Sequence, residues 1–277
     1  MRLVTLRTAS GPRAGRVEGN EVLELDFADV GELLDTGPEW RQAAATGGKA
    51  WGPLDEADLA PVIPAPRKII CVGLNYASHI TEMGREPPVH PTIFAKYARA
   101  LVGPRDPIIL PRVSEKVDWE VELAVVIGEP VRHADEAAAC EAIAGFTILN
   151  DVSVRDWQFR TNQFLQGKTF ESTTPLGPAL VTSDEVDDPS DLELRCEVDG
   201  EEMQSGNTSD LIFSPVELVR YLSIIMTLEP GDVIATGTPS GVGAGREPEV
   251  HLRPGQRVRT AVEGLGEMVN TCVEEEG

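Results

Sequence analysis

The stretch VDWEVELAVVIG, residues 117–128, joins an apolar, β-favouring run to two carboxylates, Glu120 and Glu122. Side chains alternate between the two faces of a strand, so both glutamates share one face, which continues with Ala124 and Val126. That face is acidic only at its start, which predicts that the glutamates lie at the mouth of a semi-buried cavity. Two like charges on one face repel each other, and a divalent cation would remove the repulsion. A solvated edge strand is the alternative that this stretch alone leaves open.

Around this stretch, short apolar runs of the strand type recur, at residues 69–73, 108–110, 119–127, 145–151, 179–182, 192–198, 232–236 and 257–263. Helical patterns are fewer. Residues 135–145 are Ala-rich with an acidic first turn, and residues 214–225 begin with Ser214, Pro215 and Glu217, the pattern of a capping box. There is no GxGxxG motif and no regular alternation of strands and helices. The sequence therefore predicts a β-rich α+β fold and not a Rossmann fold.

The first part of the chain differs in character from the rest. Residues 1–62 predict a small N-terminal β-rich domain followed by a linker, because three prolines, Pro61, Pro64 and Pro66, favour extended backbone there. Residues 63–277 then form the main domain.

Composition narrows the possible functions. The formal net charge of −22 argues against binding to nucleic acid or to an anionic membrane, since both need a cationic surface. No apolar run is long enough for a transmembrane helix, and the first residues lack the apolar core of a signal peptide. The four cysteines form no CxxC pair and are expected to be reduced and mostly buried. We therefore expect a cytoplasmic protein.

Three further segments offer candidate site residues. Asp151 follows an apolar strand, a common position for site residues, although an Asx turn or a helix cap would explain it equally. His79 and Glu82 are three residues apart and would share one face of a short helix, where a carboxylate can orient an imidazole; an ordinary surface pair is the alternative. Lys168 lies in the turn-rich stretch QGKTF and could face an anionic substrate or simply be a surface lysine. Residues 231–245 form a Gly/Thr-rich loop that resembles an anion cradle or a set of turns.

The ordered set of segments resembles the fumarylacetoacetate hydrolase (FAH) family, in particular its bacterial acylpyruvate hydrolase and oxaloacetate decarboxylase-like branch. The resemblance covers about residues 62–270 and is carried by GLNYASHITEMG, PTIFAKYARALVGPRDPI, VDWEVELAVVIG, NDVSVRDWQ, QGKTF, GNTSDLIFSPVELV and LEPGDVIATGTPSGVG. No single segment is decisive, but their order along the chain is highly specific. The resemblance implies an FAH-type roll of mixed β-sheets with few helices, and residues 63–277 would be its catalytic domain.

The resemblance also implies roles for individual residues. Mg²⁺ or Mn²⁺ would be held by Glu120, Glu122 and Asp151. A catalytic dyad on a mobile segment would be formed by His79 and Glu82, with Lys168 facing the substrate. Arg155, Gln158 and Thr238 match positions near the carboxylate and oxo groups of the substrate. The pocket wall would set selectivity, with candidates Arg85, Phe159, Arg160 and Phe164.

The activity implied is hydrolysis of the C–C bond of short 2,4-dioxo acids, acylpyruvates such as fumarylpyruvate, with a pyruvate enolate as the leaving group. The partner would be a small anionic 2-oxo acid, and the family suggests a homodimer. Two other enzyme activities remain open, oxaloacetate decarboxylation and isomerisation or tautomerisation of hydroxydienoic acids in aromatic catabolism. A non-catalytic ligand-binding relative on the same fold is the alternative from another class.

Overall fold

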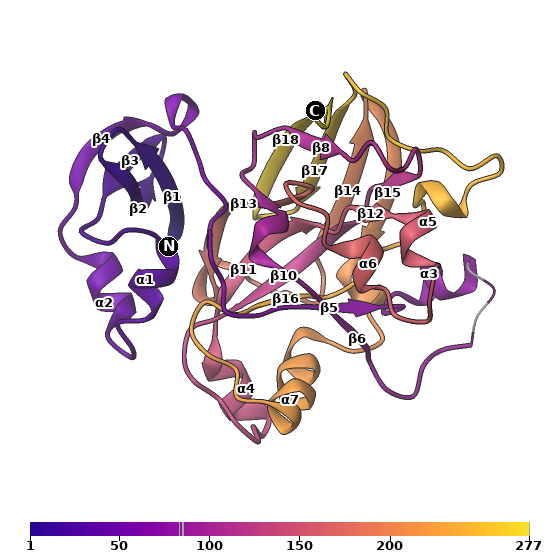
Figure 1. The fold of residues 1–277 in the computed structure, drawn as a ribbon. Coiled ribbons are helices and arrows are strands. Elements are labelled where there is room, and N and C mark those ends of the chain that lie inside the picture. Colours follow the sequence, from indigo (N-terminus) through magenta and orange to yellow (C-terminus); the bar gives the residue numbers. More distant parts are fainter. Residues whose placement is uncertain (83, 85, 277) are drawn as a thin grey trace.

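The computed structural model describes residues 1–82, 84 and 86–276 (Figure 1). Its largest sheet has 11 strands in the order β4-β3-β2-β1-β13-β11-β10-β16-β5-β6, with β7 paired to β13. These strands are β1 (Arg2–Thr8), β2 (Gly11–Glu18), β3 (Glu21–Glu24), β4 (Lys49–Pro53), β5 (Ile69–Gly73), β6 (Thr92–Lys96), β7 (Leu101–Val102), β10 (Val121–Ile127), β11 (Ile143–Asn150), β13 (Thr174–Thr182) and β16 (Val233–Ala235). Most neighbours are antiparallel, but β16 with β5 and β13 with β7 are parallel, so the sheet is mixed.

A second sheet of five strands has the order β15-β14-β17-β18-β8, and β12 pairs with β9. These strands are β8 (Ile108–Leu110), β9 (Val117–Asp118), β12 (Ser153–Val154), β14 (Glu193–Val198), β15 (Glu201–Asn207), β17 (Arg257–Val262) and β18 (Gly266–Glu274). The helices are α1 (Val30–Leu34), α2 (Trp40–Ala45), α3 (Ala77–Glu82), α4 (Glu136–Ala142), α5 (Arg155–Gln158), α6 (Leu165–Lys168) and α7 (Pro215–Ile225). The fold is therefore β-rich α+β with short helices, as expected. Within the described residues, no helix is both long and apolar enough to span a membrane.

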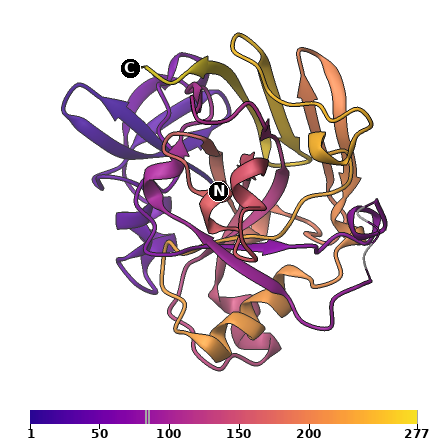
Figure 2. The same ribbon diagram turned by 45° about the vertical axis from the view of Figure 1, so that its right-hand side comes forward.

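Strand β10 lies at the centre of the molecule, with β11 on one side and β16 on the other. One face of β10, including Leu123 and Val125, packs in a core with the five-stranded sheet and with α4 and α7. The other face, with Ala124 and Val126, packs in a second core that includes side chains of α1 and α2. Figure 2 shows α4 and α7 side by side below the sheets, away from the five-stranded sheet. The alternative interpretation, a solvated edge strand, is therefore wrong, because every residue of β10 is buried.

The pairing register of β10 decides which residues meet at its start. Val121 is opposite Asn150 of β11, so Glu120 lies opposite Asp151, whose backbone N–H donates to the Glu120 carbonyl at 2.8 Å. On the other side of β10, Ala124 is opposite Ala235 of β16. Continuing this antiparallel register by two residues places Gly237 opposite Glu122. Three segments far apart in the sequence therefore converge at one end of β10.

The local sequence predictions agree with the structure in most places. Strand-type runs coincide with β5, β8, β10, β11, β13, β14, β16 and β17, although several bounds differ. The predicted helix at 135–145 ends earlier, at Ala142, because its last residues pair with neighbouring strands as the start of β11. The helix at 214–225 forms as α7, and Ser214 and Glu217 make the predicted capping box.

The N-terminal residues form the lobe drawn in indigo and purple in Figure 1, with β1–β4, α1 and α2 together. Strand β1 pairs with β13, which joins this lobe to the main sheet. The proline-rich segment that follows is anchored at Val62, whose N–H donates to Leu176 and whose carbonyl accepts from the Thr5 hydroxyl. The domain boundary after residue 62 stays a prediction.

The capping box of α7 provides a test of the local structure. Replacing Ser214 with Ala removes the side chain that accepts from the Glu217 N–H at 3.3 Å. We expect a loss of about 1 kcal/mol in the free energy of unfolding, as is typical of N-cap residues. Chemical denaturation measures this, with the exposed Ser205→Ala of β15 as control. An equal effect of the two substitutions would show that the cap contributes nothing of its own.

Candidate active site

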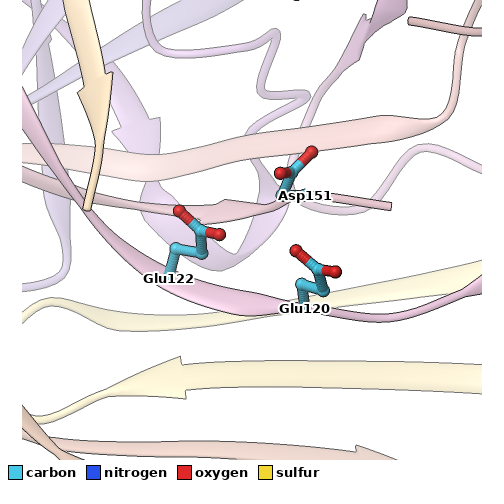
Figure 3. Close-up of side chains that lie close together, drawn as sticks. All are labelled: Glu120, Glu122 and Asp151. Atoms are coloured by element: carbon cyan, nitrogen blue, oxygen red, sulfur yellow. The ribbon is translucent and has the colours of Figure 1, made fainter. Parts of the chain in front are cut away.

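Three buried carboxylates meet at the start of β10. Ligand atoms of Glu120, Glu122 and Asp151 lie within 4.8 Å of one another, and Figure 3 shows the two glutamates on one strand with Asp151 close by. Their exposed fractions are 6 %, 2 % and 0 %. The structure therefore brings together the three residues that the sequence proposed as metal ligands.

Three buried cations contact Glu120 and Asp151, and one of them is shared with a further carboxylate, Asp118. The Lys168 ammonium lies 2.7 Å from Glu120 and 2.8 Å from Asp151. Lys96, whose side chain is fully buried, lies 2.7 Å from the second oxygen of Asp151. Arg155 contacts Glu120 at 2.7 Å, and its Nε donates to Asp118 at 2.7 Å. Each of these cations contacts at least one buried carboxylate.

Glu122 differs from its neighbours because it forms no ion pair within the described part of the chain. Its Oε2 accepts a hydrogen bond from the backbone N–H of Gly237 at 2.8 Å. Burial, reinforced by the charges of Asp151 and Glu120, raises the pKa of Glu122 well above its ordinary value. Burial would also raise the pKa of Glu120, but Lys168 and Arg155 outweigh it and lower that pKa to about 2. With Asp118 included, four buried carboxylates stand against the three cations, so the cluster is one positive charge short.

The donor set fits a divalent cation. Carboxylate oxygens without Cys or His in the triad form a hard oxygen site, the kind that Mg²⁺ and Mn²⁺ prefer. The missing positive charge beside Glu122 gives a physical reason for an ion there. Glu120, Glu122 and Asp151 could therefore hold a metal ion.

His79 and Glu82 form a pair on α3. His79 Nδ1 lies 3.0 Å from Glu82 Oε2, and the histidine is 9 % exposed. Glu82 in turn accepts from the backbone N–H of Gly241, with 3.1 Å to Oε1. The predicted short helix and shared face are thus present, and the pair is held by the Gly-rich loop as well.

His79 of the pair and Glu120 and Glu122 of the triad border one cavity of about 210 Å³. The predicted residues His79, Lys168, Arg155, Gln158 and Thr238 also line it. The structure thus gathers seven of the predicted site residues at one cavity, and Glu82 and Asp151 lie directly behind them, in contact with His79 and Lys168. Their individual roles stay predictions.

The predicted substrate-binding residues are tied into the frame of the cavity. Gln158 Oε1 accepts from Arg155 at 2.9 Å. The Thr238 hydroxyl donates to the Val121 carbonyl at 2.9 Å and accepts from Gln204 at 2.8 Å. Both side chains hold neighbouring groups in place in addition to lining the cavity.

The wall of the cavity is partly apolar. Phe159 and Phe164 line it, as expected for selectivity residues, together with Phe94 and Val72. Arg160 instead stacks on the Trp157 ring, with 3.5 Å from its guanidinium carbon to the ring centroid, and does not line the cavity. Arg85 lies outside the described residues.

Sequence reasoning missed two charged residues. Lys96 is the last residue of β6, and its ammonium donates to Asp151. Asp118 accepts from the backbone N–H groups of Gly243 at 2.7 Å and Ala244 at 3.0 Å, and it also contacts Arg155. Asp118 lies in the same short stretch as Glu120 and Glu122, so alternation would have placed all three on one face. A lone lysine at a strand end gives no such signal.

Comparison with known proteins identifies the family of this chain. The family description "Fumarylacetoacetate (FAA) hydrolase C-terminal" matches residues 68–273. The chain belongs to the fumarylacetoacetate hydrolase family. The family resemblance seen in the sequence is confirmed, and proteins similar to this chain include a tautomerase, an isomerase and a hydrolase.

Individual relatives are similar over nearly the whole chain. Human oxaloacetate tautomerase FAHD2A, mitochondrial, is 44 % identical over 289 residues, which cover 99 % of this chain and 92 % of the relative. The crystal structure of a putative HpcE protein from Mycobacterium smegmatis has 40 % identity and a TM-score of 0.91, with 100 % of both chains covered. Maleylpyruvate hydrolase from Sphingobium sp. SYK-6, in complex with manganese(II) and pyruvate, has 30 % identity and a TM-score of 0.81, also with 100 % coverage of both.

The charge balance of the triad predicts opposite effects for two matched substitutions. Glu122→Gln should abolish Mn²⁺ binding and yet raise the melting temperature of the metal-free protein at pH 7. Because the folded pKa of Glu122 is raised, its ionisation opposes folding at any pH above the unfolded value, and Gln removes that cost. A gain of about 1 kcal/mol corresponds to about 2–4 °C in a chain of this size.

Glu120→Gln is the matched control and should destabilise the metal-free protein at pH 7. Its folded pKa of about 2 is depressed, so its contribution is present above pH 4.5 and is lost as the pH falls toward 2. The expected loss is roughly 2–4 kcal/mol at neutral pH. Thermal unfolding and titration calorimetry with Mn²⁺ measure both variants. Unchanged Mn²⁺ affinity in Glu122→Gln would contradict the site.

Proposed function

We propose that this protein is a tautomerase of short 2-oxo dicarboxylates such as oxaloacetate, and that it uses Mg²⁺ or Mn²⁺. One observation carries the proposal: a carboxylate-oriented imidazole, His79 with Glu82 at 3.0 Å, borders the same cavity as Glu120 and Glu122 of the buried triad. The similarity to human oxaloacetate tautomerase over 99 % of the chain supports this reaction over the others of the family.

The hydrogen bond to Glu82 assigns the role of each ring nitrogen of His79. A carboxylate accepts, so Nδ1 carries the proton in that contact and Nε2 keeps its lone pair. Nε2 can therefore act as a general base toward a substrate in the cavity. Glu82 then stabilises the imidazolium that forms when Nε2 takes up a proton.

The buried cations suit an anionic substrate. Lys168 and Arg155 line the cavity and hold positive charge beside the carboxylates, in a protein whose net charge is −22. Burial would lower the pKa of Lys168, but Asp151 and Glu120 outweigh it and raise that pKa, so the ammonium stays charged. A divalent ion held by Glu120, Glu122 and Asp151 would supply Lewis-acid polarisation of the keto and carboxylate oxygens.

Tautomerisation then needs only one proton to be moved between two atoms of the substrate. In the direction from enol to ketone, His79 Nε2 accepts the proton of the enol hydroxyl and delivers a proton to C3. The electrons of the broken O–H bond form the C=O bond of the ketone, those of the C=C bond form the new C3–H bond, and the imidazole returns to its neutral form. The reverse direction uses the same atoms, since His79 takes the proton from C3 first.

Hydrolysis of an acylpyruvate is the second candidate, and it is the activity that the sequence resemblance first suggested. The same Nε2 could deprotonate a water, and the hydroxide would attack the distal carbonyl of a 2,4-dioxo acid. The C–C bond would then break to give the free acid, and the departing pyruvate enolate would take the proton back from Nε2. The similarity to maleylpyruvate hydrolase, which was crystallised with manganese(II) and pyruvate, favours this candidate. Oxaloacetate decarboxylation would not need this water, because breaking the bond to CO₂ itself leaves the pyruvate enolate, which a proton delivered to C3 converts to pyruvate.

A substrate panel separates these activities. We expect the protein with Mg²⁺ or Mn²⁺ to accelerate the disappearance of the oxaloacetate enol, followed by its ultraviolet absorbance. Acetylpyruvate and fumarylpyruvate report hydrolysis, and pyruvate release from oxaloacetate reports decarboxylation. Exhaustive chelation should abolish the activity, and re-addition of Mn²⁺ should restore it. Full activity after chelation would refute the metal requirement, and no turnover of any substrate would favour a ligand-binding relative.

His79→Ala tests the proton carrier. We expect tautomerisation to fall by about 100-fold or more, the typical contribution of a general base, while Mn²⁺ affinity is kept because His79 is not in the triad. His90→Ala is the control, since His90 is exposed and stacks on Tyr221. Retention of wild-type turnover in His79→Ala would rule out this mechanism.

A further inference from the structure

The Gly-rich loop at residues 237–245 binds carboxylates of the protein itself. Gly237 donates to Glu122 at 2.8 Å, and Gly241 donates to Glu82 at 3.1 Å. Gly243 and Ala244 both donate to a third carboxylate, Asp118. The anion cradle suggested by the sequence is present, and its described anions are side chains of the site.

The three carboxylates belong to different parts of the machinery. Glu122 is one of the triad, Glu82 holds His79, and Asp118 holds Arg155, which in turn contacts Glu120. A single loop of nine residues thus fixes the proton-transfer pair and the charged cluster to one backbone segment. The relative position of the two depends on this loop.

At two positions of the loop, the backbone conformation favours glycine. Gly237 and Gly241 have φ angles of +103° and +96°, a region that favours glycine. A Cβ at Gly241 would also collide with the carbonyl oxygen of Met203. These positions cannot test the contact with Glu82 on its own, because a substitution would distort the loop.

Gly245 is different, because its backbone conformation is one that any residue can adopt. The three heavy atoms nearest to a Cβ built there all belong to the Glu82 carboxylate, at 3.1 Å from Cδ and 3.3 Å from each oxygen. These distances are shorter than ordinary van der Waals contacts, so Glu82 must move by a few tenths of an ångström. The absence of a side chain at 245 therefore leaves room for the Glu82 carboxylate.

We infer that Gly245 is a positioning residue for proton transfer: together with the Gly241 N–H it holds the Glu82 carboxylate where that carboxylate orients His79. This inference rests on the proposed function, since it takes His79 to be the proton carrier. It goes beyond the pair itself by assigning its placement to the Gly-rich loop. The other end of the loop contacts Glu122, so the metal site should not sense a change at 245.

Gly245→Ala is the kinetic test. We expect kcat for the enol substrate to fall by about 10- to 100-fold, because small misplacement of a catalytic group has large effects on rate. KM and Mn²⁺ affinity should stay unchanged. In a Glu82→Ala background the same substitution should cause no further loss, since the carboxylate that it displaces is gone. An equal loss in both backgrounds, or unchanged kcat, would overturn the inference.

Hydrogen exchange of the Gly241 amide gives a readout that does not depend on activity. This amide donates to Glu82, so its exchange should accelerate in both Gly245→Ala and Glu82→Ala relative to the wild type. If the wild type turns over no substrate, the proposed function fails while this measurement still tests the contact. If Gly245→Ala did not fold, Glu82→Ala alone would test it without a change in the loop. Unchanged exchange in Glu82→Ala would overturn the contact.

Discussion

The antiparallel register of β10 with its two neighbours is the constraint on which the site depends. It sets Glu120 opposite Asp151 on one side and leads Gly237 to Glu122 on the other. A slip of one residue would turn both glutamates to the opposite face and bring the apolar residues of β10 to the cavity. Because both faces of β10 pack in separate cores, such a slip would disrupt both cores at once. The packing that stabilises the fold therefore also fixes the geometry of the carboxylates.

Burial determines how strongly the ion pairs of this cluster affect the stability of the protein. In water, lysine and carboxylate pairs contribute little, but here Lys168, Lys96 and Asp151 are at most 2 % exposed. Removing one partner would leave an uncompensated buried charge, which costs several kcal/mol. The cluster also resolves the apparent conflict between a net charge of −22 and an anionic substrate. The surface is acidic as a whole, while the cavity holds fixed cations and one carboxylate, Glu122, that lacks a cationic partner among the described residues.

Sequence patterns found what local periodicity encodes and missed what only the tertiary fold brings together. Alternation placed Glu120 and Glu122 on one face, and the capping pattern at Ser214 marked the start of α7. The helix predicted at 135–145 was too long, because apolar residues such as Ile143 suit helix and strand alike and pairing with β10 decided the outcome. Lys96 has an ordinary sequence context and acquires its role only when β6 reaches the end of β11. Residues far apart in sequence leave no local signal of their contact.

In the mechanism proposed here, the reaction depends on what approaches His79 Nε2. A substrate proton leads to tautomerisation, whereas a water molecule in the same place leads to hydrolysis. The wall beside the charged cluster is apolar, and the rings of Phe94 and Phe164 pack edge to face there, with centroids 5.7 Å apart. Such a wall offers a water molecule few hydrogen-bond partners, and a water needs two or more to be held in position. The proposed tautomerisation moves a proton within the bound oxo acid and needs no water, whereas hydrolysis would need polar lining residues elsewhere in the cavity, such as Gln158 and Thr238, to hold one.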